Sequence, residues 1–151
     1  MTNEELKIKL TELIPSISFE EGNEWLTINV EPSNWKIIAQ QLQSNEAFKF
    51  DYLFCITCVD WKTHLTMVYH LTSTIYRHTL VIKAKLDRNN PEIETVSDIW
   101  RTAEFHEREV YDLFGVKFLH HPDLRRLLLT DDFDGFPLRK DFEDPVNMIK
   151  L

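Results

Sequence analysis

The residues most able to do chemistry lie together in the stretch HEREVYDLFG, positions 106–115. A helical zinc-hydrolase motif requires His-Glu-x-x-His, so that two histidines lie one turn apart on one face. Position 110 is Val110, so the second ligand is missing. Acid–base chemistry stays open, with Glu107 as a general base of raised pKa assisted by His106. The alternative is that Glu107 is a buried structural anchor, which we favour because no nucleophile pattern or glycine-rich loop accompanies the pair.

Cys55 and Cys58 form a C-x-x-C pair, which could be half of a zinc site or a thioredoxin-like redox pair. Their flanks, YLFCITCVDW, are β-branched and aromatic, which favours a strand. Side chains three residues apart on a strand point to opposite faces, so they cannot easily share a metal or form a disulfide. No second cysteine pair completes a four-cysteine zinc site. We interpret the pair as two thiols in a buried strand.

Three histidines on neighbouring predicted strands, His64, His70 and His78, could converge on a metal. His64 and His70 are, however, about 20 Å apart along one strand, and no carboxylate falls at ligand spacing. We therefore predict that these histidines are exposed or hydrogen-bonded rather than metal ligands.

The composition is that of one ordinary globular domain. The 151 residues include 25 acidic and 17 basic side chains, a net charge of -8, which disfavours nucleic-acid binding. Only 3 residues are Gly, which argues against a phosphate-binding loop. The stretch MTNEELKIKL lacks the apolar region of a secretory signal, and no apolar run approaches the ~18 residues of a membrane helix. We expect a cytoplasmic chain that reaches a membrane only through a partner.

The hydrophobic pattern predicts an α+β fold: two layers, with a mixed or antiparallel sheet and helices on one side. Thr2 with Glu5 resembles a capping box, and Gly22-Asn23 is a hairpin signal. Gly115 is expected to end the last helix. The predicted helices cover 2–14, about 32–43 and about 97–114, and the predicted strands cover 16–21, 24–31, about 48–59, 64–72 and 77–86, in the order α-β-β-α-β-β-β-α.

The last predicted helix positions Glu107. On a wheel of about 100° per residue, Glu107 falls between Trp100 and Phe114, inside the apolar arc. A buried carboxylate is costly unless a cation or several donors surround it. An anchor predicts that replacement of Glu107 by Gln lowers stability or assembly, whereas a base predicts an intact fold without activity. The candidate partners lie downstream: Arg125, Arg126, Arg139 and Lys140.

The opposite side of the same helix is predicted to be polar. Arg101, Arg108 and Asp112 fall on that side, and Glu109 lies nearer its edge. Glu104 can pair with Arg108 at i, i+4. This side is therefore expected to face solvent.

The segment after Gly115 is expected to be an extended, irregular arm (116–151), following an α+β domain (1–115). Three prolines and Gly135 break its sequence, and only Leu124–Leu129 could make a short helical turn or strand. Its many Leu and Phe residues are too apolar for simple disorder. Such a segment packs on its own domain or on a partner surface, which favours aromatics and Arg. Both possibilities stay open.

Four motifs, in this order and with these gaps, resemble the C subunit, of 30-kDa type, of respiratory complex I, the proton-pumping NADH:quinone oxidoreductase. The strong match covers 97–142. Three positions depart from the usual pattern: His120 replaces Gly, Phe136 replaces His, and Glu143 replaces Pro. The motifs are Glu107-Arg108-Glu109, Asp112-Leu113-Phe114-Gly115, His121-Pro122-Asp123-Leu124-Arg125-Arg126 and Pro137-Leu138-Arg139-Lys140-Asp141-Phe142.

The resemblance implies a scaffold and assembly subunit of the peripheral arm, without catalytic, cofactor or metal sites of its own. NADH, FMN, iron–sulfur clusters and quinone would belong to the assembled complex. The implied partners are the hydrogenase-large-subunit-like D subunit and the cluster-bearing B subunit, at the cytoplasmic face of the cell membrane. A related membrane-bound hydrogenase, or a photosynthetic or deazaflavin-linked complex, is the alternative within the superfamily. A small stand-alone acid–base enzyme using His106 and Glu107 is the alternative from another class.

The residues expected to form interface contacts or structural anchors come from the same motifs. The arginines and Lys140 are expected in interface or intrachain ion pairs, and the aspartates as their partners or as caps. The set is Glu107, Arg108, Glu109, Asp112, Arg125, Arg126, Pro137, Leu138, Arg139, Lys140 and Asp141.

Overall fold

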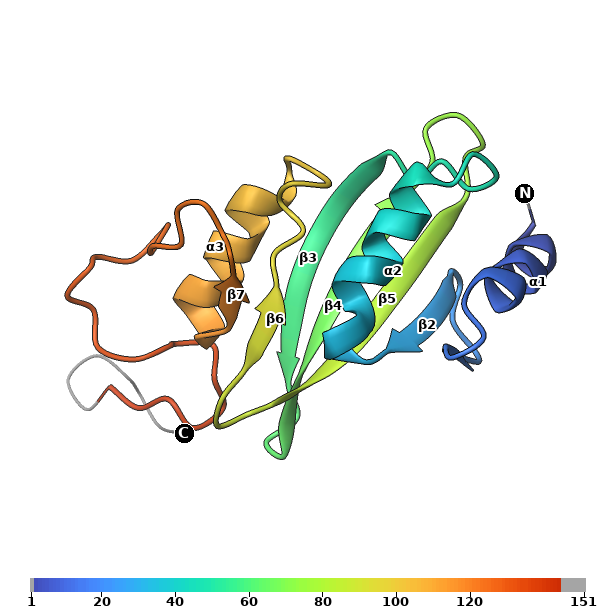
Figure 1. Cartoon of the computed structure of the whole chain (residues 1–151). Coiled ribbons are helices and arrows are strands. Elements are labelled where there is room, and N and C mark those ends of the chain that lie inside the picture. The colour runs from blue at the N-terminus through green and yellow to red at the C-terminus, as the bar shows by residue number, and fades with distance from the viewer. Residues whose placement is uncertain (1, 145–151) are drawn as a thin grey trace.

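The computed structural model describes residues 2–144. Figure 1 shows α2 against one face of a twisted sheet, α1 beside β2 and α3 on the side of β3. Among the described residues, no helix combines the length and apolarity that a membrane span requires. The elements are α1 (Asn3–Leu13), β1 (Ser18–Glu20), β2 (Leu26–Val30), α2 (Pro32–Ser44), β3 (Tyr52–Asp60), β4 (His64–Thr72), β5 (Thr79–Asp87), β6 (Glu92–Glu94), α3 (Ala103–Phe114) and β7 (Lys117–Leu119).

The main sheet has five strands in the order β1-β2-β5-β4-β3. Strands β3, β4 and β5 form an antiparallel meander, and β1 pairs antiparallel with β2. Strand β2 runs parallel to β5, which makes the sheet mixed. The predicted α+β fold with a mixed sheet is confirmed.

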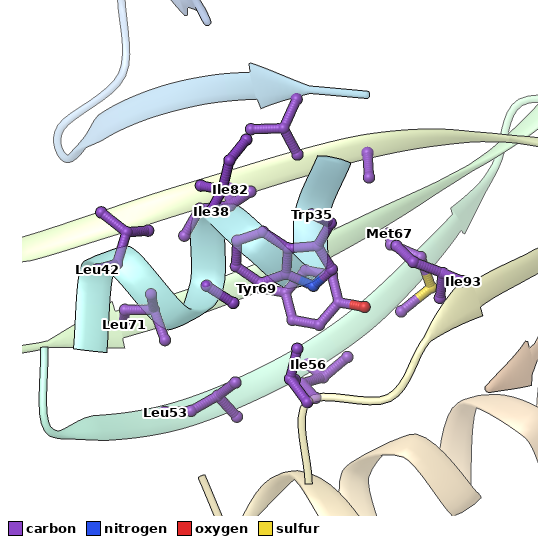
Figure 2. Close-up of a cluster of buried hydrophobic side chains, with 14 of the residues drawn as sticks. Trp35, Ile38, Leu42, Leu53, Ile56, Met67, Tyr69, Leu71, Ile82 and Ile93 are labelled. Carbon is purple, nitrogen blue, oxygen red and sulfur yellow. The ribbon is translucent and has the colours of Figure 1, made fainter. Parts of the chain in front are cut away.

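The core lies between this sheet and α2. Strand register aligns Ile28, Ile82, Tyr69 and Ile56 in one row across β2, β5, β4 and β3. Trp35 of α2 packs on this row, with its ring centroid 4.8 Å from that of Tyr69 (Figure 2). Because successive side chains of a strand alternate between faces, the row also defines which residues face away from the core.

Helix boundaries follow local signals at three positions. Thr2 and Glu5 form the predicted capping box at the start of α1. Gly115 ends α3 in the left-handed conformation, with φ of 79°. Pro32 occupies the first turn of α2, where its missing N–H has no cost.

The last helix begins later than predicted, at Ala103 rather than near Ser97. Tertiary hydrogen bonds hold the preceding residues in turns: the Trp100 indole donates to the Phe50 carbonyl at 2.9 Å, and the Thr102 hydroxyl donates to the Leu53 carbonyl at 2.6 Å. Periodicity alone cannot detect such contacts.

A second, two-stranded parallel sheet was not predicted. It pairs β6 with β7, and each strand has only 3 residues, too few for a periodic signal. Strand β7 (117–119) occupies the start of the segment expected to be irregular, so the irregular part begins after it.

Candidate functional site

The arm, defined here as residues 120–144, contains no helix or strand and loops around α3 (Figure 1). Several hydrogen bonds attach the arm to α3. The Leu138 N–H donates to the Leu113 carbonyl at 3.0 Å, and His121 Nε2 donates to the Glu104 carbonyl at 3.0 Å. The described part of the arm thus packs on its own domain; residues 145–151 of the predicted segment lie outside the described residues.

Asp112 of α3 is fully buried and collects donors from the arm. Its Oδ2 accepts the backbone N–H groups of Leu127, Leu128 and Leu129 at 3.2, 2.7 and 3.0 Å. Its Oδ1 accepts the Arg126 guanidinium at 3.0 Å. Burial alone would raise the pKa of Asp112, but these hydrogen bonds outweigh burial and hold the pKa below its usual value. The ionised carboxylate orders this loop as an anion orders a nest of N–H groups.

Arg126 ties this loop to the next turn of the arm. Besides the Asp112 carboxylate, its guanidinium donates to the carbonyls of Asp112, Phe133 and Gly135 at 2.9–3.0 Å. The ring of Phe136 lies under the guanidinium, 5.1 Å from centroid to Cζ. One side chain therefore crosslinks α3 and both turns of the arm.

The predicted polar side of α3 is in fact a second buried face. Arg108 is 6% exposed and donates to the carbonyls of Arg125 and Arg126 at 3.2 and 3.0 Å. The predictions that Arg108 and Asp112 face solvent, and that Arg108 pairs with Glu104, are wrong. The physical reason is that the arm covers this side of the helix.

A second buried aspartate, Asp60, holds the far end of the arm. It accepts two hydrogen bonds from Arg88, at 3.1 and 2.8 Å, and the N–H groups of Lys140 and Lys62 at 2.9 and 2.7 Å. Burial would raise the pKa of Asp60, but the Arg88 guanidinium and the N–H donors lower it to about 2. Arg88 also pairs with Asp141 at 3.1 Å.

Two features of this second anchor were not expected. Lys140 uses its backbone N–H, not its ammonium group. Sequence reasoning also missed Asp60 and Arg88, because they lie 28 residues apart and no motif or spacing links them.

Gly115 joins the end of α3 to the arm. The ring of Phe136 packs so closely that a Cβ at position 115 would lie 2.7 Å from it. Arg139 donates to the Phe114 carbonyl at 2.6 Å, and Tyr111 meets Phe136 edge-on at 6.2 Å. The unusual Phe136 thus fills a space between helix end and arm.

Glu107 is fully buried, as predicted, but its partners lie upstream. The Thr95 hydroxyl donates to Oε1 at 2.6 Å, and the Val96 N–H donates to Oε2 at 3.2 Å. Lys36 of α2 binds the Thr95 carbonyl at 2.7 Å. The prediction that a downstream cation pairs with Glu107 is wrong. Arg126 binds Asp112 and Arg139 binds the Phe114 carbonyl instead. Burial raises the pKa of Glu107 to about 8 despite the two donors.

The acid–base interpretation of Glu107 requires access that the structure does not provide. Glu107 is 0% exposed and lies behind the 95–96 segment. A general base must reach within hydrogen-bonding distance of a substrate proton. The raised pKa therefore reflects a buried acid in the core, and the structure favours the anchor interpretation.

The remaining predicted residues are more exposed. The Arg125 guanidinium pairs with Asp123 at 2.9 Å, and 65% of its side chain is exposed. Leu138 is 52% exposed, while Pro137 and Glu109 are half-buried. These are side chains that a partner could reach.

Cys55 and Cys58 are free thiols on β3, as predicted. Burial raises the pKa of both, that of Cys58 to about 12. We expect iodoacetamide at pH 8 to label native Cys58 at least about a hundredfold more slowly than the urea-unfolded chain, because the thiolate is the nucleophile. Mass spectrometry of labelled peptides measures this. Rapid labelling of native Cys58, or an oxidised pair that a Cys55→Ser/Cys58→Ser variant abolishes together with function, would support the redox alternative instead.

The histidines do not converge. His78 is buried, with Nε2 2.7 Å from the Phe48 carbonyl, and His70 packs against Phe54. Within residues 2–144, no group of three or more His, Cys, Asp or Glu side chains could hold a metal ion.

Solved structures share this architecture. A chain in the structure of the membrane-bound sulfane sulfur reductase, an archaeal respiratory membrane complex, superposes with a TM-score of 0.80 and 28% identity, over 93% of this chain and 85% of that one. The trypsin-resistant fragment (1–134) of Nqo5 gives a TM-score of 0.68 and 26% identity, over 82% and 100%. The α+β fold is thus shared with a chain in the structure of a respiratory membrane complex.

Sequence similarity specifies the family. Residues 28–146 match the respiratory-chain NADH dehydrogenase 30 Kd subunit, and the chain belongs to this family. The NADH-quinone oxidoreductase C subunit of Moorella thermoacetica is 39% identical over 136 residues, 89% of this chain and 90% of the relative. The C/D subunit of Phocaeicola vulgatus is 42% identical over 118 residues, and the C subunit of Chloroherpeton thalassium is 41% identical over 111. The matches span 77% and 72% of this chain but 23% and 46% of those two relatives. The resemblance to the 30-kDa-type family of complex I is confirmed.

Proposed function

We propose that the chain is a scaffold and assembly subunit of the peripheral arm of a proton-translocating NADH:quinone oxidoreductase. It binds no cofactor itself and supports electron transfer from NADH to quinone by holding its neighbours in place. Its partners are the D subunit and the cluster-bearing B subunit, at the cytoplasmic face of the membrane. Two findings support this proposal. The chain belongs to the 30 Kd subunit family, and its similarity to the Moorella thermoacetica C subunit covers nearly the whole length of both chains.

The observation that carries the assembly role is the ordered loop at 127–129. Fixing a residue's backbone costs about 1–2 kcal/mol in conformational entropy, and Asp112 fixes three consecutive residues. Yet Leu128 is 66% and Leu127 37% exposed, so the ordering does not serve to bury them. A rigid loop with outward apolar side chains is preorganised for a partner surface.

Neighbouring side chains extend the same surface. Phe105 of α3 is 58% exposed, and the Arg108 guanidinium lies over its ring, with Cζ 5.6 Å from the ring centroid. Leu138 and the Arg125 head are exposed on the arm. Aromatic, Leu and Arg side chains of this kind supply the anchors of protein interfaces.

A purification from native membranes tests the proposal. The tagged chain, expressed at its native level, is recovered from detergent-solubilised membranes, and NADH:quinone-analogue activity is measured on the eluate. Co-purification of the D-type and cluster-bearing subunits with activity is the expected result. Recovery with a sulfur-reducing or hydrogenase-type complex lacking this activity favours a second candidate, which the 0.80 superposition supports. Recovery of the chain alone contradicts both and favours a stand-alone enzyme.

Leu128→Asp is expected to reduce the recovered partner subunits at least about tenfold, because burying a leucine at an interface contributes about 1.5–3 kcal/mol. The thermal midpoint of the purified chain should stay unchanged, since Leu128 is exposed in the free chain. Ile75→Asp is the matched control, because Ile75 is 60% exposed in the turn between β4 and β5. Equal recovery with both variants would remove this loop from the interface.

A further inference from the structure

The face of the main sheet that points away from α2 carries unusual side chains. A sheet covered on one face usually presents polar residues on the other. Here the neighbouring side chains of Trp61 and Val59, at the end of β3, are 55% and 37% exposed. Single exposed apolar residues need no explanation, but a group on one face marks a contact surface.

The face is hollowed beside Trp61. A depression of about 240 Å³ lies between Trp61 and Val59 on one side and Lys83 and Lys85 of β5 on the other. A second depression, of about 330 Å³, also has Lys83 and Lys85 in its wall, together with Asn29. An apolar wall thus faces a pair of amines across a shallow hollow.

The two lysines of the hollow differ in their partners. Lys83 pairs with Glu20 of β1 at 3.0 Å. Lys85 lies two residues further along β5 on the same side, and strand register places His64, Thr66 and Asp87 beside it. Glu31 lies at the rim of the second depression. With Glu20 matched to Lys83, the Lys85 ammonium is the charge that a ligand's carboxylate would meet beside the indole of Trp61.

We propose that this sheet face docks a second protein partner, which places a carboxylate on Lys85 and an apolar side chain against Trp61 and Val59. The proposal rests on the proposed function, since the partner is another polypeptide of the same assembly. It adds an interface that is distinct from the arm, because strands β1–β5 of the main sheet line the hollow and α3 does not.

Other occupants fit the face less well. Anionic membranes and nucleic acids attract clusters of several cations, whereas this hollow has two lysines in a chain of net charge -8. A second copy related by a two-fold axis through the hollow would bring Lys83 and Lys85 close to their own equivalents, and the like charges would repel. An acidic and apolar protein surface complements the face.

Zero-length carbodiimide crosslinking of the purified assembly tests the docking surface. We expect mass spectrometry to find Lys85 Nζ joined to an Asp or Glu of another polypeptide. Reductive methylation of Lys85 should be at least about tenfold slower in the assembly than in the isolated chain, while Lys9 on the exposed side of α1 is modified equally in both. Lys85→Glu should lower recovery of that polypeptide, and Lys9→Glu, the matched control, should not.

Several outcomes overturn the inference. Equal methylation of Lys85 in the assembly and the isolated chain leaves the face open and removes the interface. If Lys85 is crosslinked only to Glu20, or only to a second copy of the chain, the proposed protein partner is not the occupant of this face. If the assembly forms normally with Lys85 open, only this inference fails; if the chain joins no assembly, the proposed function fails as well.

Discussion

Asp112→Asn releases the arm from α3. The amide cannot accept three N–H groups and a guanidinium as the carboxylate does, and its own NH₂ group faces the donors of Leu127–Leu129. Breaking a buried, hydrogen-bonded ion pair typically costs about 3–5 kcal/mol. We expect a loss of about 3 kcal/mol at this site, a large part of the total stability of a small domain.

Hydrogen exchange measures the release locally. The amides of Leu127, Leu128 and Leu129 should exchange about a hundredfold faster in Asp112→Asn, because each 1.4 kcal/mol corresponds to a factor of about ten. The amides of β4 and β5 should keep their protection. Asp123→Asn is the control, since its half-exposed pair with Arg125 contributes little. Unchanged exchange at 127–129 would show that the carboxylate does not order the loop.

Glu107→Gln makes the protein more stable above pH 5, which is opposite in sign to the expectation from sequence for an anchor. The folded pKa of about 8 lies above the ordinary value of 4.5. Between these values the folded state binds more protons than the unfolded state, so stability falls as pH rises through this window and is constant above it. Gln resembles the protonated acid and does not titrate.

The size of the effect follows from the same linkage. The free energies of unfolding of the two proteins should coincide near pH 4.5 and diverge by about 1.4 kcal/mol per pH unit up to about pH 8. The ionised form is then destabilised by an amount on the order of 5 kcal/mol. Urea unfolding at pH 5, 7 and 9 measures the gap.

The matched control is Glu104→Gln, which removes the same charge from a half-exposed position of the same helix. A gap for Glu107→Gln that is independent of pH, or one that favours the wild type at pH 9, would mean that Glu107 is ionised in the folded protein. The anchor would then depend on charge rather than on the hydrogen bonds to Thr95 and Val96.

The sequence predicted side-chain burial correctly where a helix has a single buried side and one periodic apolar pattern. The apolar stripe of α2 and the position of Glu107 in the apolar arc of α3 were predicted correctly, because a wheel detects a single buried side. Arg108 and Asp112 were placed wrongly for the same reason. The arm that covers them has no period, so the second buried side leaves no trace in helical spacing.

Long-range pairings were the other limit. Glu107 was expected to bind downstream cations, and it binds the Thr95–Val96 segment instead. Asp60 contacts Lys140, 80 residues away, through a backbone N–H that any residue but proline would supply. The order of the motifs indicates the family, whereas no spacing or periodicity in the sequence indicates these contacts.

The parallel pairing of β2 with β5 also determines the order in which the chain can fold. The β3–β4–β5 meander is built from neighbours in sequence, and such local pairings form fastest. The β1–β2 hairpin is synthesised before β5, so the inner edge of β2 has no partner until β5 has been made. Until then the edge of β2 that carries Ile28 and Val30 has no strand beside it, and we expect this edge to be prone to association during synthesis.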